Sequence, residues 1–213
     1  MIGKIVITRT GYDPGAGKHV KDPYLGDCPT LGACRPDVRE QLGVGDHVFF
    51  VSGKVRGVDQ FVLGGFEIAE KIHASEAYER FPHLRLRKLE DGQLTGNIIV
   101  DARGRQHEMD DHNNFERRVQ NYVVGKNLLV LSTPAEIAQG RAHTLEILRT
   151  VIGGKGASPR EIMGRWHNLS EEQILKLRAF LETLKRAARE SEIGVRNSVA
   201  KHAPQVLTKV GTS

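Results

Sequence analysis

The densest group of side chains that could bind a metal or transfer a proton spans residues 107 to 114, His-Glu-Met-Asp-Asp-His-Asn-Asn. Two histidines with an intervening aspartate would suit a divalent cation, as a nuclease requires. Stretches so rich in Asp and Asn are more often solvated turns, and a third interpretation lets Asp111 or Asn113 read the edge of a base. The weak metal candidates are therefore His107, Asp111 and His112, and nothing in the sequence requires a cofactor.

Arginines and tyrosines recur through the first forty residues at positions that could surround a base or a phosphate. Tyrosine rings offer stacking faces, and arginine offers a planar fork of donors for phosphate or base edges. These properties make Arg9, Tyr12, Tyr24 and Arg35 candidates for a pocket. The alternatives are that Tyr24 fills the core and that Arg39 makes a structural ion pair.

Two other motifs are weaker. The chain has two cysteines, Cys28 and Cys34, which are too few for a disulfide framework and are not spaced as a zinc site. We therefore expect small packing residues and a reducing cytoplasm. The glycine-rich run 15–19 resembles a phosphate-binding loop but has Tyr12 where that motif needs glycine and His19 where it needs Ser or Thr. It could still form a flexible loop over a pocket.

The elements that must position these residues are mostly strands up to about residue 132. Short apolar runs separated by turn residues predict a small barrel, with a bulge or bend at Gly64–Gly65. The segment from Gly11 to Pro36 lacks a regular pattern and reads as a long functional loop. The predicted strands are Ile2–Thr8, His47–Ser52, Gln60–Lys71, Asn97–Val100 and Lys126–Ser132, and the predicted short helices are Pro36–Leu42 and Ser75–Arg80.

From Ala135 onward the pattern is helical. Ser158 and Ser170 each stand at the start of a capping sequence. The helix after Ser170 carries an apolar stripe of Ile174, Leu177, Leu181 and Leu184, which must be buried against the barrel or a second copy of the chain. Trp166 lies between two predicted helices and is expected to plug their hinge. The chain is thus expected to divide into a barrel, 1–134, and a helical extension, 135–213.

The charge of the chain is concentrated at one end. Its 31 Lys and Arg against 26 Asp and Glu give +5, of which residues 178–213 carry +4. A main part so nearly neutral does not suit a protein that coats duplex DNA by charge alone. The basic end could hold a polyanion loosely, or could be a solvated helix face. No run approaches the roughly 18 apolar residues of a membrane helix.

One longer pattern resembles a known family. It comprises the run Asp22-Pro23-Tyr24-Leu25-Gly26-Asp27-Cys28, its continuation to Arg39, and the later Gly45-Asp46 turn. This order is similar to the second of the nucleotide-modification-associated domain families of bacteria and phages. The likeness covers about residues 2–132. The family is associated with the PUA, ASCH, EVE and YTH group of small barrels.

The resemblance implies an α+β fold, a small PUA-like mixed β-barrel with flanking short helices and a helical C-terminal extension. It implies binding of a modified nucleobase or a nucleotide, within a bacterial or phage DNA base-modification or defence system. The expected partners are nucleic acid, with DNA preferred, or free nucleotide, with no membrane and with a homodimer through the C-terminal helices as an option. The expected binding residues are Arg9, Tyr12, Tyr24, Thr30, Arg35, Arg39, Ser52, Gly53, Asn97, Asp111 and Asn113.

Two other functions stay open. The chain could be an enzyme that acts on a base or nucleotide, with the cluster at 107–113 as its acid, base or metal site. It could instead be a protein-interaction module. That function predicts an exposed apolar stripe from Ile174 to Leu184 and no affinity for nucleic acid.

Overall fold

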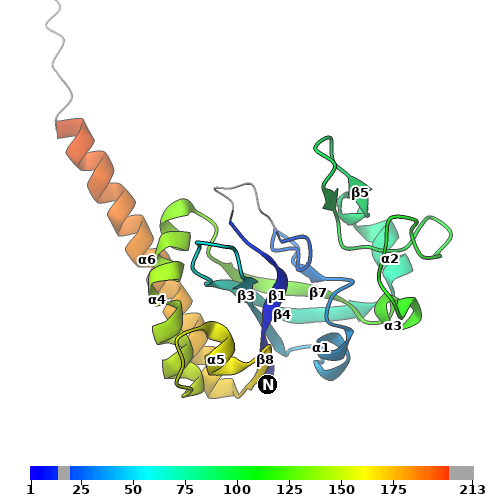
Figure 1. The fold of residues 1–213 in the computed structure, drawn as a ribbon, viewed down its shortest axis with the longest axis horizontal. Coiled ribbons are helices and arrows are strands. Elements are labelled where there is room, and N and C mark those ends of the chain that lie inside the picture. Colours follow the sequence, from blue (N-terminus) through cyan, green and yellow to red (C-terminus); the bar gives the residue numbers. More distant parts are fainter. Residues whose placement is uncertain (14–19, 202–213) are drawn as a thin grey trace, which may run out of the picture.

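The computed structural model describes residues 1–13 and 20–201, except for the side chains of Thr10 and of residues 194–201. The fold is α+β, with a six-stranded mixed sheet at its centre (Figure 1). The strands of this sheet are β1 (Gly3–Gly11), β2 (Thr30–Leu31), β3 (His47–Gly53), β4 (Val62–Ile72), β7 (Tyr122–Val130) and β8 (Trp166–Leu169). The helices are α1 (Pro36–Gln41), α2 (Ala74–Arg80), α3 (Phe115–Val119), α4 (Pro134–Ile152), α5 (Pro159–Met163) and α6 (Glu171–Lys201).

The main sheet curls into a half-barrel with the strand order β2-β7-β4-β3-β1-β8. Strands β1 and β3 are parallel, and the other neighbouring pairs are antiparallel. Gly64 has a φ of 131°, and the register between β3 and β4 shifts beside it. A side chain at this position would be strained and would strike the carbonyl of Leu129. The predicted bulge is confirmed, and it helps the sheet to bend.

Helices α4, α5 and α6 lie together on one side of the sheet (Figure 1). The predicted stripe of α6 is buried in the main core, where Ile174, Leu177 and Leu181 are fully covered. The stripe is therefore buried within its own chain, as one of the two expected arrangements has it, because α4 and the sheet cover it. The exposed stripe that a protein-interaction module would require is wrong. None of the helices in the described residues has the length and apolar character needed to span a membrane.

The chain after Ala135 is not wholly helical, so the prediction of a helical pattern throughout this part is wrong. Residues Trp166–Leu169 form β8, which pairs antiparallel with β1 and so adds an edge strand to the main sheet. A strand of four residues is too short to show a clear alternation of apolar and polar side chains. Sheet residues and residues of α4, α5 and α6 share one hydrophobic core.

A second, smaller core lies on the other side of the sheet, around α2, α3 and a 3₁₀ turn at Pro82–Leu84 (Figure 1). The hairpin of β5 (Arg87–Lys88) and β6 (Leu94–Thr95) projects next to it. The predicted strand at Asn97–Val100 is wrong. Its apolar residues are buried, but the segment makes only isolated bridges, Ile98 to Arg85 and Val100 to Gln106.

Candidate functional site

A cleft of about 1300 Å³ opens beside the end of β1, between the half-barrel and helices α4 and α5. Its walls come from segments far apart in the sequence, including β1, the loop before α1, the loop after β3, α4, and the α5–β8 region. Among the described residues, three aspartates line it, Asp22, Asp37 and Asp59. The cationic side chains that line it in the same described part are seven, Arg9, Arg35, Lys54, Arg118, Arg141, Arg160 and Arg165, and we call this site the cationic cleft.

Five of the seven cations have no acidic partner within salt-bridge distance among the described residues. These five are Arg9, Lys54, Arg118, Arg160 and Arg165. Of the other two, Arg141 pairs with Asp13 at 3.2 Å. Arg35 forms a bidentate pair with Asp37 at 2.7 and 2.9 Å, and this pairing lowers the pKa of that carboxyl group. The unmatched positive charge gives the cleft a preference for anionic ligands.

One wall of the cationic cleft is built around the carboxylate of Asp22. Its Oδ1 atom accepts hydrogen bonds from the Gly32 amide at 2.9 Å and from Asn97 Nδ2 at 3.1 Å. Its Oδ2 atom accepts one from the Cys34 amide at 2.5 Å. A side chain at position 32 would meet the Asn97 carbonyl oxygen at 2.4 Å, so the close approach requires glycine there. Much of the run that carries the family resemblance thus serves to fix one carboxylate at the cleft.

Asn97 and Thr30 form a buried layer behind Asp22 and do not face a ligand. Asn97 Nδ2 also donates to Thr30 Oγ1 at 2.9 Å, and Asn97 Oδ1 accepts from the hydroxyl of Tyr122 at 2.8 Å. Burial raises the pKa of that tyrosine. The prediction that Asn97 and Thr30 contact the base is corrected, because their hydrogen-bonding groups are used inside the protein.

The thiol of Cys34 lines the same wall but is not poised for chemistry. Burial, followed by the nearby Asp22 carboxylate, raises its pKa to about 12. Burial also raises the pKa of Cys28. Both thiols therefore stay protonated at neutral pH, which argues against a thiolate nucleophile.

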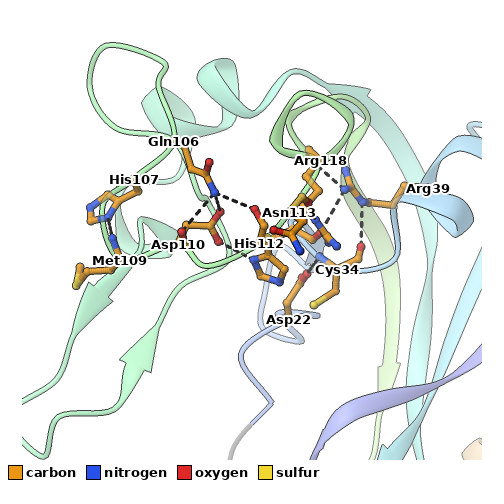
Figure 2. Close-up of polar contacts among 11 residues, drawn as sticks. Asp22, Cys34, Arg39, Gln106, His107, Met109, Asp110, His112, Asn113 and Arg118 are labelled. Atoms are coloured by element: carbon orange, nitrogen blue, oxygen red, sulfur yellow. Dashed lines mark hydrogen bonds and ion pairs between the residues drawn. The ribbon is translucent and has the colours of Figure 1, made fainter.

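His112 projects toward the Asp22 wall and is held by a buried carboxylate (Figure 2). Asp110 Oδ1 lies 2.6 Å from His112 Nδ1, and the Asp110 side chain is 2% exposed. Gln106 Nε2 donates to Asp110 Oδ2 at 2.8 Å and to the His112 carbonyl at 2.9 Å. The pair resembles the carboxylate–histidine arrangement that fixes an imidazole tautomer, leaving Nε2 for another partner.

Ligand-type atoms of Asp110, Asp111 and His112 lie within 4.8 Å of one another, but His107 is not among them. His107 points the other way, and its Nδ1 accepts from the Met109 amide at 3.2 Å (Figure 2). The three weak metal candidates therefore do not converge, because His107 lies apart from Asp111 and His112. Because His112 Nδ1 and both oxygens of Asp110 already make hydrogen bonds, the group is better described as an oriented histidine than as a preformed metal site.

The prediction that Arg39 is a binding residue is corrected. Arg39 is fully buried, and its guanidinium donates to five backbone carbonyls, among them those of Cys34 at 3.1 Å and Arg118 at 3.0 Å (Figure 2). Burial lowers the pKa of Arg39 to about 10. Every donor points inward, so Arg39 stabilises the loops and leaves no donor for a ligand.

The two predicted stacking tyrosines do not line the cationic cleft. The Tyr12 ring packs against Phe61 at 5.9 Å, and Tyr24 packs edge-on against His83 at 5.7 Å. Ser52 is buried, and its hydroxyl accepts from the Phe61 amide. The Gly53 amide donates to Thr8 Oγ1 at 2.8 Å, so Gly53 contributes to the cleft only by supporting Thr8.

Asp111 and Asn113 are exposed and do not line the cationic cleft. Asn113 contributes indirectly, since its carbonyl accepts from Arg118 Nε at 2.8 Å and so helps to place that arginine. Of the eleven predicted binding residues, all of them described, Arg9 and Arg35 line the cleft, joined by the weak metal candidate His112.

Most of the cationic residues of the cleft are not among the predicted binding residues. Arg141, Arg160 and Arg165 stand in the part treated as a helical extension, and Trp166 was expected to be a buried plug. Trp166 is instead 42% exposed at the cleft. The adjacent residues Arg165 and Trp166 are the one local feature of the sequence that could have indicated this part of the cleft, because neighbouring basic and aromatic residues are typical of nucleic-acid contacts.

The basic end of the chain contributes less free charge than its composition indicates. Lys185 is bound to Glu136 and to the Val130 carbonyl, both at 2.7 Å. Arg186 and Arg189 are exposed on α6. The tail after residue 201 and the glycine-rich run 15–19 lie outside the described residues.

Comparison of the chain with protein-family models, with curated proteins and with solved structures finds no match.

Proposed function

We propose that the cationic cleft binds an anionic ligand that carries a nucleobase, either a nucleotide or a segment of nucleic acid. The observation that carries this proposal is the charge of the cleft wall. Among the described residues, seven Lys and Arg side chains and three Asp side chains line the cleft, whereas the whole chain has 31 Lys and Arg residues and 26 Asp and Glu residues. Such local excess attracts phosphates and raises their rate of association.

A polar group beside the cations offers a means of reading a base. The oriented His112 imidazole has one hydrogen-bonding atom, Nε2, left for the edge of a base. The buried Asp110 carboxylate holds this ring, so its position is fixed before a ligand arrives. Fixed polar groups favour discrimination between ligands that differ by a single substituent.

The resemblance of residues 2–132 to the second nucleotide-modification-associated family supports the same ligand class. It favours a PUA-like barrel, a modified base as the feature recognised, and DNA as the polymer. A bacterial or phage base-modification or defence system in the cytoplasm is the corresponding setting. The curled half-barrel is compatible with this proposal.

The test is an equilibrium titration at one fixed salt concentration. The panel contains single- and double-stranded oligonucleotides of one sequence, with the central base plain, methylated or hydroxymethylated, and the matching nucleotides. We expect tighter binding to one modified form, and we expect His112→Ala to reduce that preference more than it reduces binding to the plain strand. Equal affinity for every member, unchanged in His112→Ala, would contradict recognition of a base.

A second function, an enzyme acting on a base or nucleotide, is favoured by the 2.6 Å contact between Asp110 and His112 at the cleft. An imidazole held by a buried carboxylate is the usual form of a general base. Mass spectrometry of each oligonucleotide and nucleotide after incubation would detect a product. A product formed by wild type and lost in both His112→Ala and Asp110→Asn would establish the enzyme, whereas unchanged ligands would support binding alone.

A further inference from the structure

The indole of Trp166 is the most exposed aromatic ring at the cationic cleft. It belongs to the first residue of β8, opposite Val6 of β1, and is 42% exposed. The other aromatic residue at the cleft, Phe50, is 1% exposed and belongs to the core. Trp166 is also the single tryptophan of the chain. The cleft therefore offers one large aromatic surface to a ligand.

The ring is held from within the protein. Lys4 Nζ lies 4.3 Å from the centroid of the indole, and the same ammonium donates to Asn168 Oδ1 at 2.6 Å. Lys4 is 4% exposed, so this contact is a fixed part of the sheet edge. A cation against a π face is worth about 0.5–2 kcal/mol and restrains the ring. The indole is thus fixed in place while much of its surface remains open to solvent.

Two cations line the cleft together with this ring. Arg165 precedes Trp166 in the chain, and Arg160 lies on α5 at the same cleft. Aromatic side chains beside a positively charged groove are typical of proteins that bind single-stranded nucleic acid, where a base stacks on the ring and phosphates contact the cations. A base within an intact duplex presents no free face to such a ring.

The size of the cleft bears on the length of the ligand. Pockets that enclose one drug-sized molecule measure about 300–1,000 Å³. The cationic cleft measures about 1300 Å³, which exceeds that range. Its volume and its spread of cations suit several nucleotides better than one.

We infer that the ligand is a single-stranded nucleic acid segment, with one base stacked on Trp166 and the flanking phosphates near Arg160 and Arg165. This inference rests on the proposed function and adds the form of the ligand. It assigns a binding role to a residue outside the part that carries the family resemblance.

The experiment is a fluorescence titration of the full chain, which has Trp166 as its sole indole. The probes are the plain and hydroxymethylated single strands of one sequence, from the mononucleotide to about six nucleotides, and the corresponding duplexes. We expect ligand-dependent quenching, an affinity that rises with strand length, and weaker binding of the duplex. Quenching by the mononucleotide with no gain in longer strands, or tighter binding of the duplex, would overturn the inference.

Variants separate stacking from folding. Trp166→Ala should lower the affinity for the longest strand about tenfold or more, while Trp166→Phe should retain most of it. Leu175→Ala removes an exposed apolar side chain of α6 that does not line the cleft and serves as the control. Thermal melting of each variant, followed by circular dichroism, verifies the fold, and anisotropy of a labelled strand gives the affinities.

The outcomes distinguish this inference from the proposed function. If the strands bind wild type and folded Trp166→Ala equally, stacking on Trp166 is wrong, whereas the proposed function stands. If no strand, duplex or nucleotide of the panel binds wild type, the proposed function itself fails.

Discussion

The Nη1 atom of Arg39 donates to the carbonyl oxygen of Gln120 at 2.6 Å, which ties α1 to the residue that follows α3. The same guanidinium serves four further carbonyls in the loops around Ala33 and Arg118. Those loops carry Cys34, Arg35 and Arg118 to the cationic cleft. A buried cation thus holds one wall of the site without touching the ligand.

Replacing Arg39 by methionine should therefore destabilise the fold. The change leaves several buried carbonyls without donors, each of which costs about 1–3 kcal/mol. We expect a loss of at least about 3 kcal/mol in the free energy of unfolding. Urea denaturation measures it. Arg117→Ala, which removes an exposed arginine paired with Glu40, should change the stability little. A near-wild-type midpoint for Arg39→Met would contradict the structural role.

Gly32→Ala tests the close packing behind Asp22. The added methyl group would lie 2.4 Å from the Asn97 carbonyl oxygen, so the backbone must move. We expect a loss of about 1–3 kcal/mol, as for other overpacked sites, and weaker ligand binding because Asp22 shifts. Gly43→Ala is the matched control, since its nearest neighbour would lie 3.7 Å away. Equal melting temperatures of the two variants would show that residue 32 is not tightly packed against the Asn97 carbonyl oxygen.

Glu136 predicts a pH dependence of stability. Burial raises its pKa, but hydrogen bonds from Lys185 and from the amides of Ser132 and Thr133 outweigh burial and leave the pKa below its usual 4.5. Because the folded pKa is lower than the unfolded pKa, the stabilisation is complete above about pH 4.5 and is lost as the pH falls through the folded value.

Glu136→Gln should accordingly be less stable than wild type at pH 7, by about 1–3 kcal/mol, and should lose less stability on acidification. Thermal melts from neutral pH to about pH 3 measure both effects. Glu182→Gln, an exposed carboxylate on α6, controls for the change in net charge. If the melting temperatures of wild type and Glu136→Gln fell equally with decreasing pH, Glu136 would not be the source of this pH dependence.

The contact between Asp110 and His112 predicts a particular tautomer. A carboxylate at 2.6 Å from Nδ1 accepts a hydrogen bond from Nδ1–H, so the neutral imidazole carries hydrogen on Nδ1 and a lone pair on Nε2. Long-range proton–nitrogen correlation spectra report this directly. Asp110→Asn should change the tautomer balance of His112, whereas Asp111→Asn should not. A wild-type signal for the Nε2–H tautomer would contradict the arrangement.

Much of the fold could be predicted because it depends on local patterns. The buried run of β3 and the apolar stripe of α6 each repeat over several residues, and Ser158 caps α5 as its sequence indicates. The β8 strand could not be predicted, since its four residues become a strand by pairing with β1, more than 150 residues away. Tertiary pairing of this kind leaves little trace in a short segment.

The candidate site was harder to predict for the same reason. Arg39 and Arg118 are chemically identical in sequence, yet one is enclosed by carbonyls and the other lines the cleft. The residues of the cleft come from both ends of the chain and meet only through the sheet topology. Tyr24 and Asn97 belong to the expected region, but packing directs them to the second core and to the layer behind Asp22.

We propose that the cationic cleft, and not the basic face of α6, holds the nucleobase-bearing ligand. The salt dependence of binding to one labelled single strand distinguishes these two positions. Wild type is compared with the double variant Arg160→Ala and Arg165→Ala, and with the control double variant Arg186→Ala and Arg189→Ala on α6.

Each phosphate contact adds about 0.7 to the slope of log affinity against log salt for a single strand. We expect the cleft variant to bind more weakly and to lose about 1 or more from the slope, with the control close to wild type. If the control variant on α6 instead bound more weakly and with a smaller slope, while the cleft variant bound like wild type, the ligand would lie on α6 and the proposed site would be wrong.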